Sequence, residues 1–443
     1  MNPRTPNAKI VTLGCPKNEV DSEEIAGVLL ASGYEVDGSA ERTDLTIINT
    51  CGFIRSSKEE SLQAIREAIK EKANGKTRCV VVAGCLSQRI GEELVELVPG
   101  IDVCVGVGQM ARFGEIAHQA LQGSGSRVAI APPQHHYAGI GTRARTSLPW
   151  SAYLKIGEGC DHSCAFCTIP SFRGNHQSKP MERVLAEAQD LALSGAIEIN
   201  LIAQDVTQYG FDLYGKFMLP RLLHQLNKID QIRWIRLLYF YPTRVNLELL
   251  EAMTSLPKVL PYVDMPLQHS HPDVLARMNR PWDGERYLSL FAKMREAMPD
   301  IAIRSTFIVG YPGETDAEFA HLMAFLREAQ LDRVGAFVFS REQGTPSYSL
   351  DGQVPSRVKR QRYDSLMRQQ QHISWTANAK WVGRQMDVLV EQVKDGWCIG
   401  RSHRDAPEID GLVYLAGEAQ PGMIVQVEIQ RAEAYDLWGQ AVL

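Results

Sequence analysis

The sequence contains no long hydrophobic run. A helix that crosses a bilayer needs about 18 consecutive apolar residues, and no segment of the 443 residues reaches that length. The first fifteen residues, MNPRTPNAKIVTLGC, also lack the apolar stretch of a secretory signal. We therefore expect a cytoplasmic protein that has no membrane segment.

Strong charge imbalance and low-complexity tracts are absent as well. The chain has 47 Lys and Arg against 52 Asp and Glu, and 44% of its residues are hydrophobic, which excludes disordered and fibrous classes. At roughly 100 to 200 residues per domain, this length predicts two to four domains. A reducing compartment disfavours a disulfide framework for the nine cysteines, so their spacing is interpreted in terms of metal or redox chemistry.

Residues 6–122 alternate strand-like runs rich in Val and Ile with helix-like stretches, which is typical of a doubly wound parallel sheet. Ser57 and Glu60 form a potential capping box, which predicts that a helix starts at Ser57. A segment rich in Gly, Pro and Ser, residues 123–145, is expected to be a linker. The expected strands are residues 9–14, 44–50, 78–84 and 102–107.

Residues 146–377 show six β-then-α units. They predict a partial (β/α)6 barrel of the TIM type, because a full eight-unit barrel takes about 250 residues. A helix over residues 355–377 is expected to close it. Residues 378–443 have short strand-like runs and predict a small antiparallel β-barrel of the OB-like kind, so the fold class is α/β. The expected barrel strands are residues 152–156, 197–202, 232–238, 262–265, 301–309 and 333–339.

Three cysteines, Cys160, Cys164 and Cys167, lie within eight residues directly after the first expected barrel strand, and are called the loop trio below. Barrel enzymes keep their active sites at this end of the strands, and thiolates bind iron–sulfur clusters. Three ligands instead of four leave one metal position open for a substrate or cofactor. The alternative is a structural zinc with His162 or His176 as fourth ligand, but zinc sites usually pair their cysteines as CxxC.

Three further cysteines, Cys15, Cys51 and Cys85, each follow an expected strand of the first domain and are called the strand-end trio. The carboxyl ends of parallel strands converge on the ligand crevice of such a sheet, so these thiols could meet around one metal centre. The alternative is that they are small buried hydrophobes. Both interpretations stay open, whereas we expect three other cysteines in the core: Cys79, Cys104 and Cys398.

The segment from Cys160 to Pro170 resembles the signature of radical S-adenosylmethionine (SAM) enzymes. Together with the strand-end trio and the small C-terminal barrel, it is similar to the radical SAM methylthiotransferases, which combine a methylthiotransferase domain, a radical SAM barrel and a TRAM domain. The resemblance covers essentially the whole chain. Residues 401–411, RSHRDAPEIDG, resemble the RimO type, which modifies an aspartate of small-subunit ribosomal protein S-twelve, more than the branch that modifies a tRNA adenosine.

The resemblance implies a transferase that methylthiolates the β-carbon of that aspartate. It implies that SAM serves both as methyl donor and as source of a 5′-deoxyadenosyl radical. It also implies two [4Fe-4S] clusters, one held by the loop trio and an auxiliary one, which delivers sulfur, held by the strand-end trio. The implied partners are ribosomal protein S-twelve, an electron donor such as flavodoxin or ferredoxin, and a sulfur donor.

Several residues near the ends of barrel strands are candidate SAM contacts. The segment around Gly310 and Gly313 resembles the glycine-containing SAM segment of radical SAM barrels, where absent side chains let the backbone approach adenosine; a plain turn is the alternative. By strand alternation either Arg304 or Ser305 should point into the barrel, with surface salt bridging as the alternative for Arg304. The candidates are Phe166, Ile169, Gln204, Arg304, Ser305, Gly310 and Gly313.

The charge of the last domain bears on the substrate class. Residues 378–443 contain six bases and ten acids, whereas an RNA-binding module normally presents a basic face. The acidic balance favours a basic protein as the substrate. Two alternatives remain: the same chemistry on a tRNA adenosine, to which the basic segment 357–368 could contribute, and a non-enzymatic iron–sulfur or zinc protein that binds ribosomes.

Overall fold

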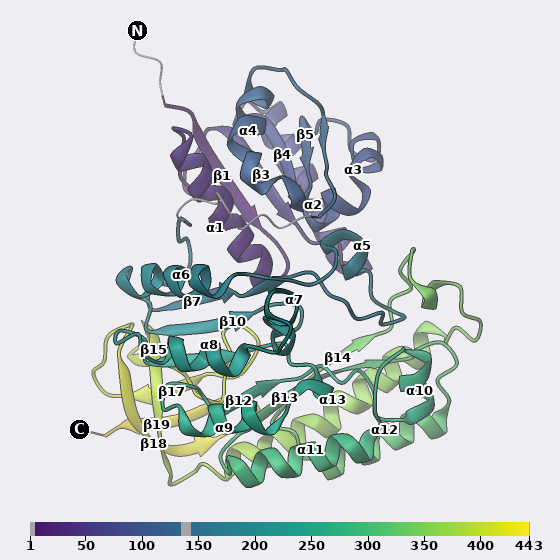
Figure 1. Cartoon of the computed structure of the whole chain (residues 1–443), viewed down its shortest axis with the longest axis vertical. Helices are drawn as coiled ribbons and strands as arrows, with labels where there is room; N and C mark the ends of the chain where they lie inside the picture. Colours follow the sequence, from purple (N-terminus) through teal and green to yellow (C-terminus); the bar gives the residue numbers. More distant parts are fainter. Residues whose placement is uncertain (1–4, 134–142, 443) are drawn as a thin grey trace.

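A parallel sheet, an open half-barrel and a small closed barrel follow one another along the chain (Figure 1). The structure is a computed structural model that describes residues 5–133 and 143–442. In Figure 1 the sheet lies above the half-barrel, and the closed barrel, in yellow, lies at lower left. None of the helices in the described ranges combines the length and the hydrophobicity that a bilayer crossing requires.

The N-terminal unit is a six-stranded parallel sheet in the order β2-β1-β3-β4-β5-β6. Its strands are buried on both faces: Ile47 and Val81 pack against α1 and α4, whereas Ile48 and Val82 pack against α2 and α3. Because β2 and β3 lie on opposite sides of β1, the winding reverses there, at the point where such sheets bind ligands. The elements are β1 (Asn7–Thr12), α1 (Pro16–Ala31), β2 (Glu35–Val36), β3 (Thr43–Thr50), α2 (Arg55–Ala73), β4 (Thr77–Gly84), α3 (Cys85–Leu97), β5 (Val103–Val105), η1 (Val107–Arg112), α4 (Phe113–Leu121) and β6 (Val128–Ala129).

Two local expectations for this unit differ from the structure. The capping box is wrong: α2 begins at Arg55, after an extended Ile54 with no side-chain cap. The Ser57 side chain interacts instead with the Cys51 thiol, so tertiary contacts override the local signal. In addition, β6 pairs with β5 inside the segment that we expected to be a linker.

The central unit is a half-barrel of six parallel strands, as the six β-then-α units predict. The strands form two three-stranded sheets, β7-β10-β11 and β12-β13-β14, which a single bridge between Ile235 and Val259 connects. Helices cover the outside, and α13 packs along β14. The strands are β7 (Ser151–Lys155), β8 (Gly157–Glu158), β9 (Gln177–Ser178), β10 (Glu198–Ile202), β11 (Trp234–Leu237), β12 (Tyr262–Asp264), β13 (Ala302–Val309) and β14 (Arg333–Val338). The helices are α5 (Ile169–Arg173), α6 (Met181–Leu193), η2 (Val206–Gln208), α7 (Phe211–Tyr214), α8 (Leu219–Leu226), η3 (Pro242–Arg244), α9 (Leu247–Ser255), α10 (Pro272–Arg277), α11 (Gly284–Ala297), α12 (Asp316–Ala329), η4 (Pro346–Tyr348) and α13 (Ser356–Ala379).

The C-terminal unit is a closed five-stranded barrel in the order β15-β16-β17-β19-β18. The expectation of a purely antiparallel barrel needs one correction, because β17 and β19 pair in parallel where the barrel closes. The strands are β15 (Gln385–Lys394), β16 (Trp397–Ser402), β17 (Val413–Ala416), β18 (Ile424–Ala432) and β19 (Leu437–Ala441).

Buried ion pairs attach this barrel to the amino ends of the half-barrel strands. Glu198, the first residue of β10, lies 2.5 Å from Nη2 of Arg401 and 3.2 Å from Nε of Arg236. At the start of β14, Arg333 pairs with Asp405 at 2.7 Å. The carboxyl ends of β7 and β10 meet α1 of the N-terminal unit, through Lys155 with Asp21 and through Lys17 with Ala203.

Replacing Glu198 with Gln tests this attachment. Burial alone would raise the pKa of Glu198, but Arg401 and Arg236 lower it from 4.5 to about 2. Stability from this carboxylate is therefore complete above pH 4.5 and is lost as the pH falls towards 2. At neutral pH we expect Glu198→Gln to lower the free energy of unfolding by roughly 3–5 kcal/mol, because two buried guanidinium groups lose their counter-charge.

Urea unfolding of both proteins at neutral and acidic pH measures the effect, and the variant should lose less stability on acidification than the wild type. The matched control is Asp300→Asn, which breaks the exposed pair with Arg384 and should cost at most about 1 kcal/mol. Equal losses from the two substitutions, or an unchanged acid sensitivity, would contradict the prediction.

Candidate functional site

The loop trio lies between β8 and α5, at the carboxyl end of β7. None of its cysteines is in a disulfide, and all three are partly exposed. Burial raises the pKa of Cys160 and of Cys167 to about 12. A metal centre is the kind of partner that keeps such thiols ionised.

Two N–H groups contact sulfur atoms of the loop trio: one belongs to an arginine side chain and the other to the backbone. Nη1 of Arg280 lies 3.7 Å from Sγ of Cys164, and the guanidinium stacks on the ring of Tyr241, 4.4 Å from its centroid. The backbone N–H of Ile169 donates to Sγ of Cys167 at 3.5 Å. Cationic and N–H neighbours stabilise thiolate charge, so this loop is suited to thiolate ligands.

The strand-end trio occupies the carboxyl ends of β1, β3 and β4, where the winding of the sheet reverses. Gly14 and Gly84 precede two of its members and have φ values of +97° and +92°. A Cβ on Gly14 would lie 2.8 Å from Cβ of Cys51, and one on Gly84 would lie 2.3 Å from a neighbouring amide oxygen. Only glycine permits so close an approach in this conformation, and the three thiols act electrostatically on one another.

One arginine of the barrel reaches the strand-end trio. Arg173 ends α5, the short helix that follows the loop trio, and donates to Sγ of Cys85 from Nε at 3.2 Å and from Nη2 at 3.0 Å. The same guanidinium contacts Asn18 Oδ1 at 2.7 Å, Asp21 at 2.8 Å and Glu158 at 3.0 Å. The helix that follows the loop trio thus contacts the strand-end trio through one side chain.

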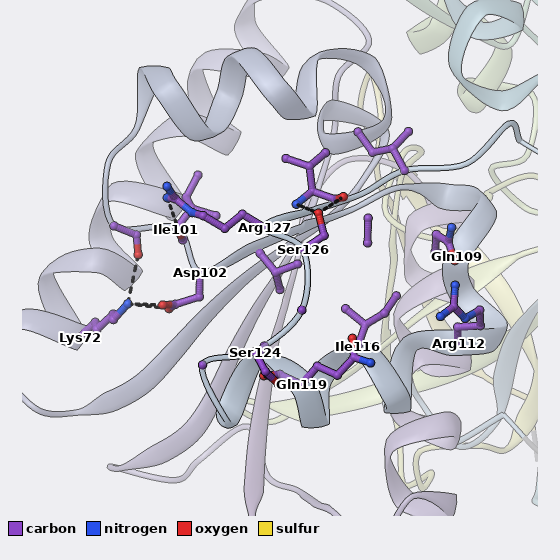
Figure 2. A pocket seen from close by; sticks show the side chains of 18 residues that line it. Lys72, Ile101, Asp102, Gln109, Arg112, Ile116, Gln119, Ser124, Ser126 and Arg127 are labelled. Atoms are coloured by element: carbon purple, nitrogen blue, oxygen red, sulfur yellow. Dashed lines mark hydrogen bonds and ion pairs between the residues drawn. The ribbon is translucent and has the colours of Figure 1, made fainter.

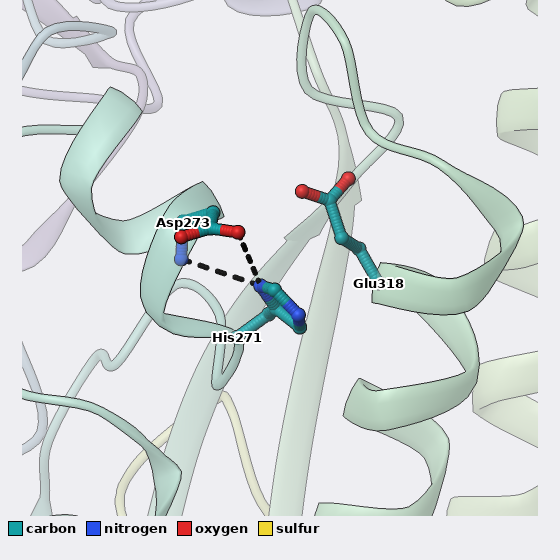
Figure 3. A group of neighbouring side chains, drawn as sticks. All are labelled: His271, Asp273 and Glu318. Atoms are coloured by element: carbon teal, nitrogen blue, oxygen red, sulfur yellow. Dashed lines mark hydrogen bonds and ion pairs between the residues drawn. The ribbon is translucent and has the colours of Figure 1, made fainter.

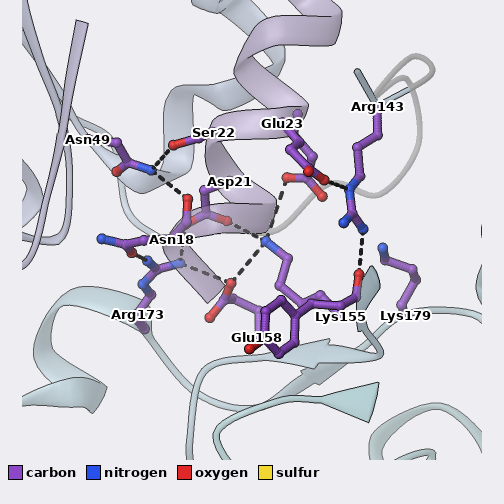
Figure 4. A network of polar contacts seen from close by, with 12 residues as sticks. Asn18, Asp21, Ser22, Glu23, Asn49, Arg143, Lys155, Glu158, Arg173 and Lys179 are labelled. Carbon is purple, nitrogen blue, oxygen red and sulfur yellow. Dashed lines mark hydrogen bonds and ion pairs between the residues drawn. The ribbon is translucent and has the colours of Figure 1, made fainter. Parts of the chain in front are cut away.

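The contact belongs to a buried polar network between α1 and the first barrel strands (Figure 4). Nζ of Lys155 lies 2.5 Å from Asp21 and 3.3 Å from Glu158. Arg143 pairs with Glu23 of α1 nearby. Charges of both signs are buried together, which fixes the sheet on the mouth of the half-barrel.

The spacing of the thiols tests whether they fit a cluster. Among the residues that the structure describes, three ligand atoms lie within 4.8 Å of one another only at His271, Asp273 and Glu318 (Figure 3). A single zinc ion with Zn–S distances of about 2.3 Å would draw its sulfurs to about 3.8 Å apart. Neither cysteine trio meets that spacing among the described residues, so the thiols are not arranged around a single zinc ion, and the cluster assignment stays a prediction.

The two histidines considered as a fourth zinc ligand have other partners. The ring of His162 stacks on Tyr241 with centroids 3.6 Å apart, and its Nε2 lies 2.8 Å from Asp205. Nε2 of His176 lies 3.1 Å from Ser178 Oγ. These contacts engage only Nε2 of each histidine, and Nδ1 of His176 is buried without a hydrogen-bond partner among the described residues, so the choice between cluster and zinc stays a prediction.

The group in Figure 3 serves helix capping. His271 Nδ1 accepts from the backbone N–H of Asp273 at the start of α10. Glu318 accepts from the backbone N–H of Thr315 at the start of α12 and pairs with Arg277 at 2.9 Å. The Glu318 charge is therefore already balanced.

A cavity of about 520 Å³ lies in the N-terminal unit (Figure 2). Its walls include Lys72, Asp102 and Arg127, and it adjoins the segments that lead into β5 and β6. These are the amino ends of the strands, whereas the strand-end trio lies at the carboxyl ends. The cavity therefore does not belong to the cysteine site.

The candidate SAM contacts next to the cysteine loop have definite partners. Phe166 packs on an apolar cluster that includes Tyr311 and Phe339. Gln204 donates from Nε2 to Glu158, and its Oε1 is buried with no hydrogen-bond partner among the described residues. An acceptor without a partner is a possible ligand contact, and the SAM role of these residues stays a prediction.

Arg304 and Ser305 are adjacent in β13 and point to opposite faces of the sheet: Arg304 lies on the inner face beside Asp264, and Ser305 lies on the face that the helices cover. Arg304 pairs with Asp264 at 2.7 Å and with Asp410 of the C-terminal unit at 3.3 Å. Ser305 donates from Oγ to the carbonyl of Met265 at 2.8 Å. Arg304 is therefore a partly buried ion-pair partner inside the half-barrel, not an exposed one, and its assignment to SAM stays a prediction.

Gly310 and Gly313 both adopt left-handed conformations after β13. A Cβ on Gly310 would lie 2.3 Å from Cγ of Lys359, whose side chain fills that space. Gly313 has more room, with its nearest neighbour at 3.8 Å. The turn accounts for both glycines, and a contact to adenosine stays a prediction.

Sequence reasoning missed three cations at the site: Lys17, Arg173 and Arg280. Each contacts groups that lie 88 to 186 positions away along the chain. For two of these cations the only signal in the sequence is closeness to a cysteine: Lys17 follows Cys15 by two residues, and Arg173 follows Cys167 by six.

Comparisons with known proteins agree with this geometry. The model of the uncharacterized protein family UPF0004 matches residues 7–106, that of the radical SAM superfamily matches residues 154–326, and that of the TRAM domain matches residues 382–442. The curated "Ribosomal protein uS12 methylthiotransferase RimO" of Trichormus variabilis is 44% identical over 99% of this chain and 98% of its own length. The protein of the same name from Chloroflexus aurantiacus is 47% identical over 98% of this chain and 99% of its own length.

Among solved structures, the radical S-adenosylmethionine methyltransferase TsrM of Kitasatospora setae shares the fold, with a TM-score of 0.58 at 16% identity over 77% of each chain. The resemblance inferred from the sequence is thus confirmed, and the radical SAM family implies a [4Fe-4S] cluster and SAM. The relatives match from end to end, so the chain belongs to the RimO family of ribosomal protein uS12 methylthiotransferases, which are radical SAM enzymes.

Proposed function

We propose that this protein methylthiolates the β-carbon of an aspartate in ribosomal protein uS12, with SAM as both methyl donor and radical source. The curated relatives, which have uS12 in their name, support this substrate. The observation that carries the proposal is the link between the two cysteine trios: Arg173, six residues after Cys167, contacts Cys85. Radical generation and sulfur delivery would then take place at one domain boundary.

We assign one [4Fe-4S] cluster to each trio. When bound, the cluster on the loop trio supplies the electron that cleaves SAM to a 5′-deoxyadenosyl radical, and the cluster on the strand-end trio supplies the sulfur. Arg280 and the Ile169 N–H stabilise thiolate charge on the first trio, and Arg173 does so on the second. The residues of Figure 4 are buried at the boundary, and burial of a reaction site protects a radical from side reactions.

The surface of the C-terminal barrel supports a protein substrate. Arg401 and Arg404, two of its six bases, are buried in ion pairs with Glu198 and Asp332. Six acids and four bases of this unit are exposed, and this small acidic excess suits a basic partner. The exposed acids are Asp387, Asp395, Glu408, Glu418, Glu428 and Glu433.

The alternative substrate, a tRNA adenosine, would be favoured by a basic face on this barrel, and the exposed acids oppose it. We further propose a flavodoxin or ferredoxin as electron donor, an external sulfur donor and a cytoplasmic location. The boundaries 6–122, 123–145, 146–377 and 378–443 remain our proposed division of the chain.

Mass spectrometry of uS12 from cells with and without this gene tests the substrate. We expect a methylthio group on one aspartate of uS12 only when the gene is present, and unchanged tRNA nucleosides in both. Loss of a methylthio group from tRNA, with uS12 unaltered, would instead identify the alternative substrate.

Separate replacement of the two kinds of cysteine tests the two-cluster assignment. After anaerobic reconstitution, Cys51→Ala should bind about half the iron, because one cluster loses a thiolate ligand, and should give measurable SAM cleavage without methylthiolation. Cys164→Ala should lose SAM cleavage. Cys104→Ala, at a buried core cysteine, is the control with full iron. Wild-type iron in Cys51→Ala would refute the assignment.

A further inference from the structure

Lys17 is a buried cation at the boundary between the sheet and the half-barrel. It is the second residue of α1, follows Cys15 by two positions and is only 8% exposed. Its Nζ donates to the carbonyl of Ala203 at 3.2 Å and lies 3.2 Å from the centroid of the Tyr239 ring. Ala203 follows β10 and Tyr239 follows β11, so the ammonium lies at the carboxyl ends of the barrel strands.

No carboxylate within the described ranges forms an ion pair with this ammonium. Burial lowers the pKa of Lys17, and the charges of Cys15, Glu158 and Asp264 oppose that effect. Glu158 is held by Lys155 and Arg173, and Asp264 is held by Arg304. A buried charge normally has an ionic partner, and the two carboxylates that could supply one here are engaged by other cations.

The surroundings hold this ammonium in place without neutralising it. Tyr239 has a φ of +65°, a conformation that is uncommon for a non-glycine residue and that sets its ring against Nζ. An ammonium has three N–H donors. One goes to Ala203, and the ring attracts the charge without accepting a strong hydrogen bond. The group can therefore still bind an anionic acceptor.

We propose that Lys17 binds the side-chain carboxylate of the substrate aspartate, an inference that rests on the proposed function. The substrate carboxylate would form an ion pair with the Lys17 ammonium. The adjoining β-carbon would then lie beside Cys15 of the strand-end trio. Adenosine has no carboxylate and would leave the charge unpaired. Lys17 is thus a residue that selects aspartate.

A double-mutant cycle on the reconstituted full-length enzyme tests this contact. The binding of uS12, and of uS12 with its target Asp replaced by Asn, is measured with wild-type enzyme and with Lys17→Met. We expect each single change to weaken binding by roughly 10- to 100-fold, as for a hydrogen bond to a charged group. The two changes together should weaken it no further, because they remove the same contact.

Three controls make the outcome unambiguous. Lys70→Met removes an exposed lysine of α2 and should not alter uS12 binding. SAM should bind Lys17→Met as it binds the wild type; weaker SAM binding would assign the ammonium to the SAM carboxylate and overturn the proposal. If Lys17→Met does not fold, equal binding of the Asp and Asn forms of uS12 by unmodified enzyme would also overturn it.

The cycle distinguishes a failure of the proposed function from a failure of the role that we propose for Lys17. If unmodified enzyme leaves uS12 without a methylthio group, the proposed function fails. If it methylthiolates uS12 but the losses from Lys17→Met and Asp→Asn multiply as independent effects, only the role of Lys17 fails.

Discussion

The structure depends on charge buried between α1 and the mouth of the half-barrel. Arg173 and Lys155 of the barrel meet Asp21 of α1 and Glu158 at distances of 2.5 to 3.3 Å. Removing one partner from such a network is costly, because the remaining charge is left without compensation in a poorly solvated place. Only one docking of the two domains satisfies all four groups. That docking brings Cys85 to Arg173 and so determines how the two cysteine trios are arranged.

The same boundary leaves one cation without a carboxylate partner among the described residues. Because Arg173 and Lys155 pair with the nearby carboxylates, the contacts of Lys17 are a carbonyl and an aromatic ring. In our proposal, the substrate carboxylate enters at this place. Docking and recognition are then two parts of one charge arrangement.

The sequence predicts the features that local periodicity or adjacency determines. The strand-end cysteines follow recognisable parallel strands, and the loop trio is contiguous, so both could be located in advance. Arg173 and Arg280 could not, because their partners Cys85 and Cys164 lie 88 and 116 positions away. The Ser57 capping box failed for a different reason, since that side chain interacts with the thiol of Cys51, six residues earlier in the chain.

The ion pairs at the amino ends of the barrel strands have a consequence for how the molecule is assembled. Glu198 meets Arg401, 203 positions later in the chain. During synthesis the half-barrel is complete in length long before that partner has emerged, so until the last domain docks Glu198 has only Arg236 and Arg333 lacks Asp405. Truncation or exchange of the C-terminal barrel would therefore leave one buried guanidinium group without its carboxylate, so the half-barrel and the last domain depend on each other.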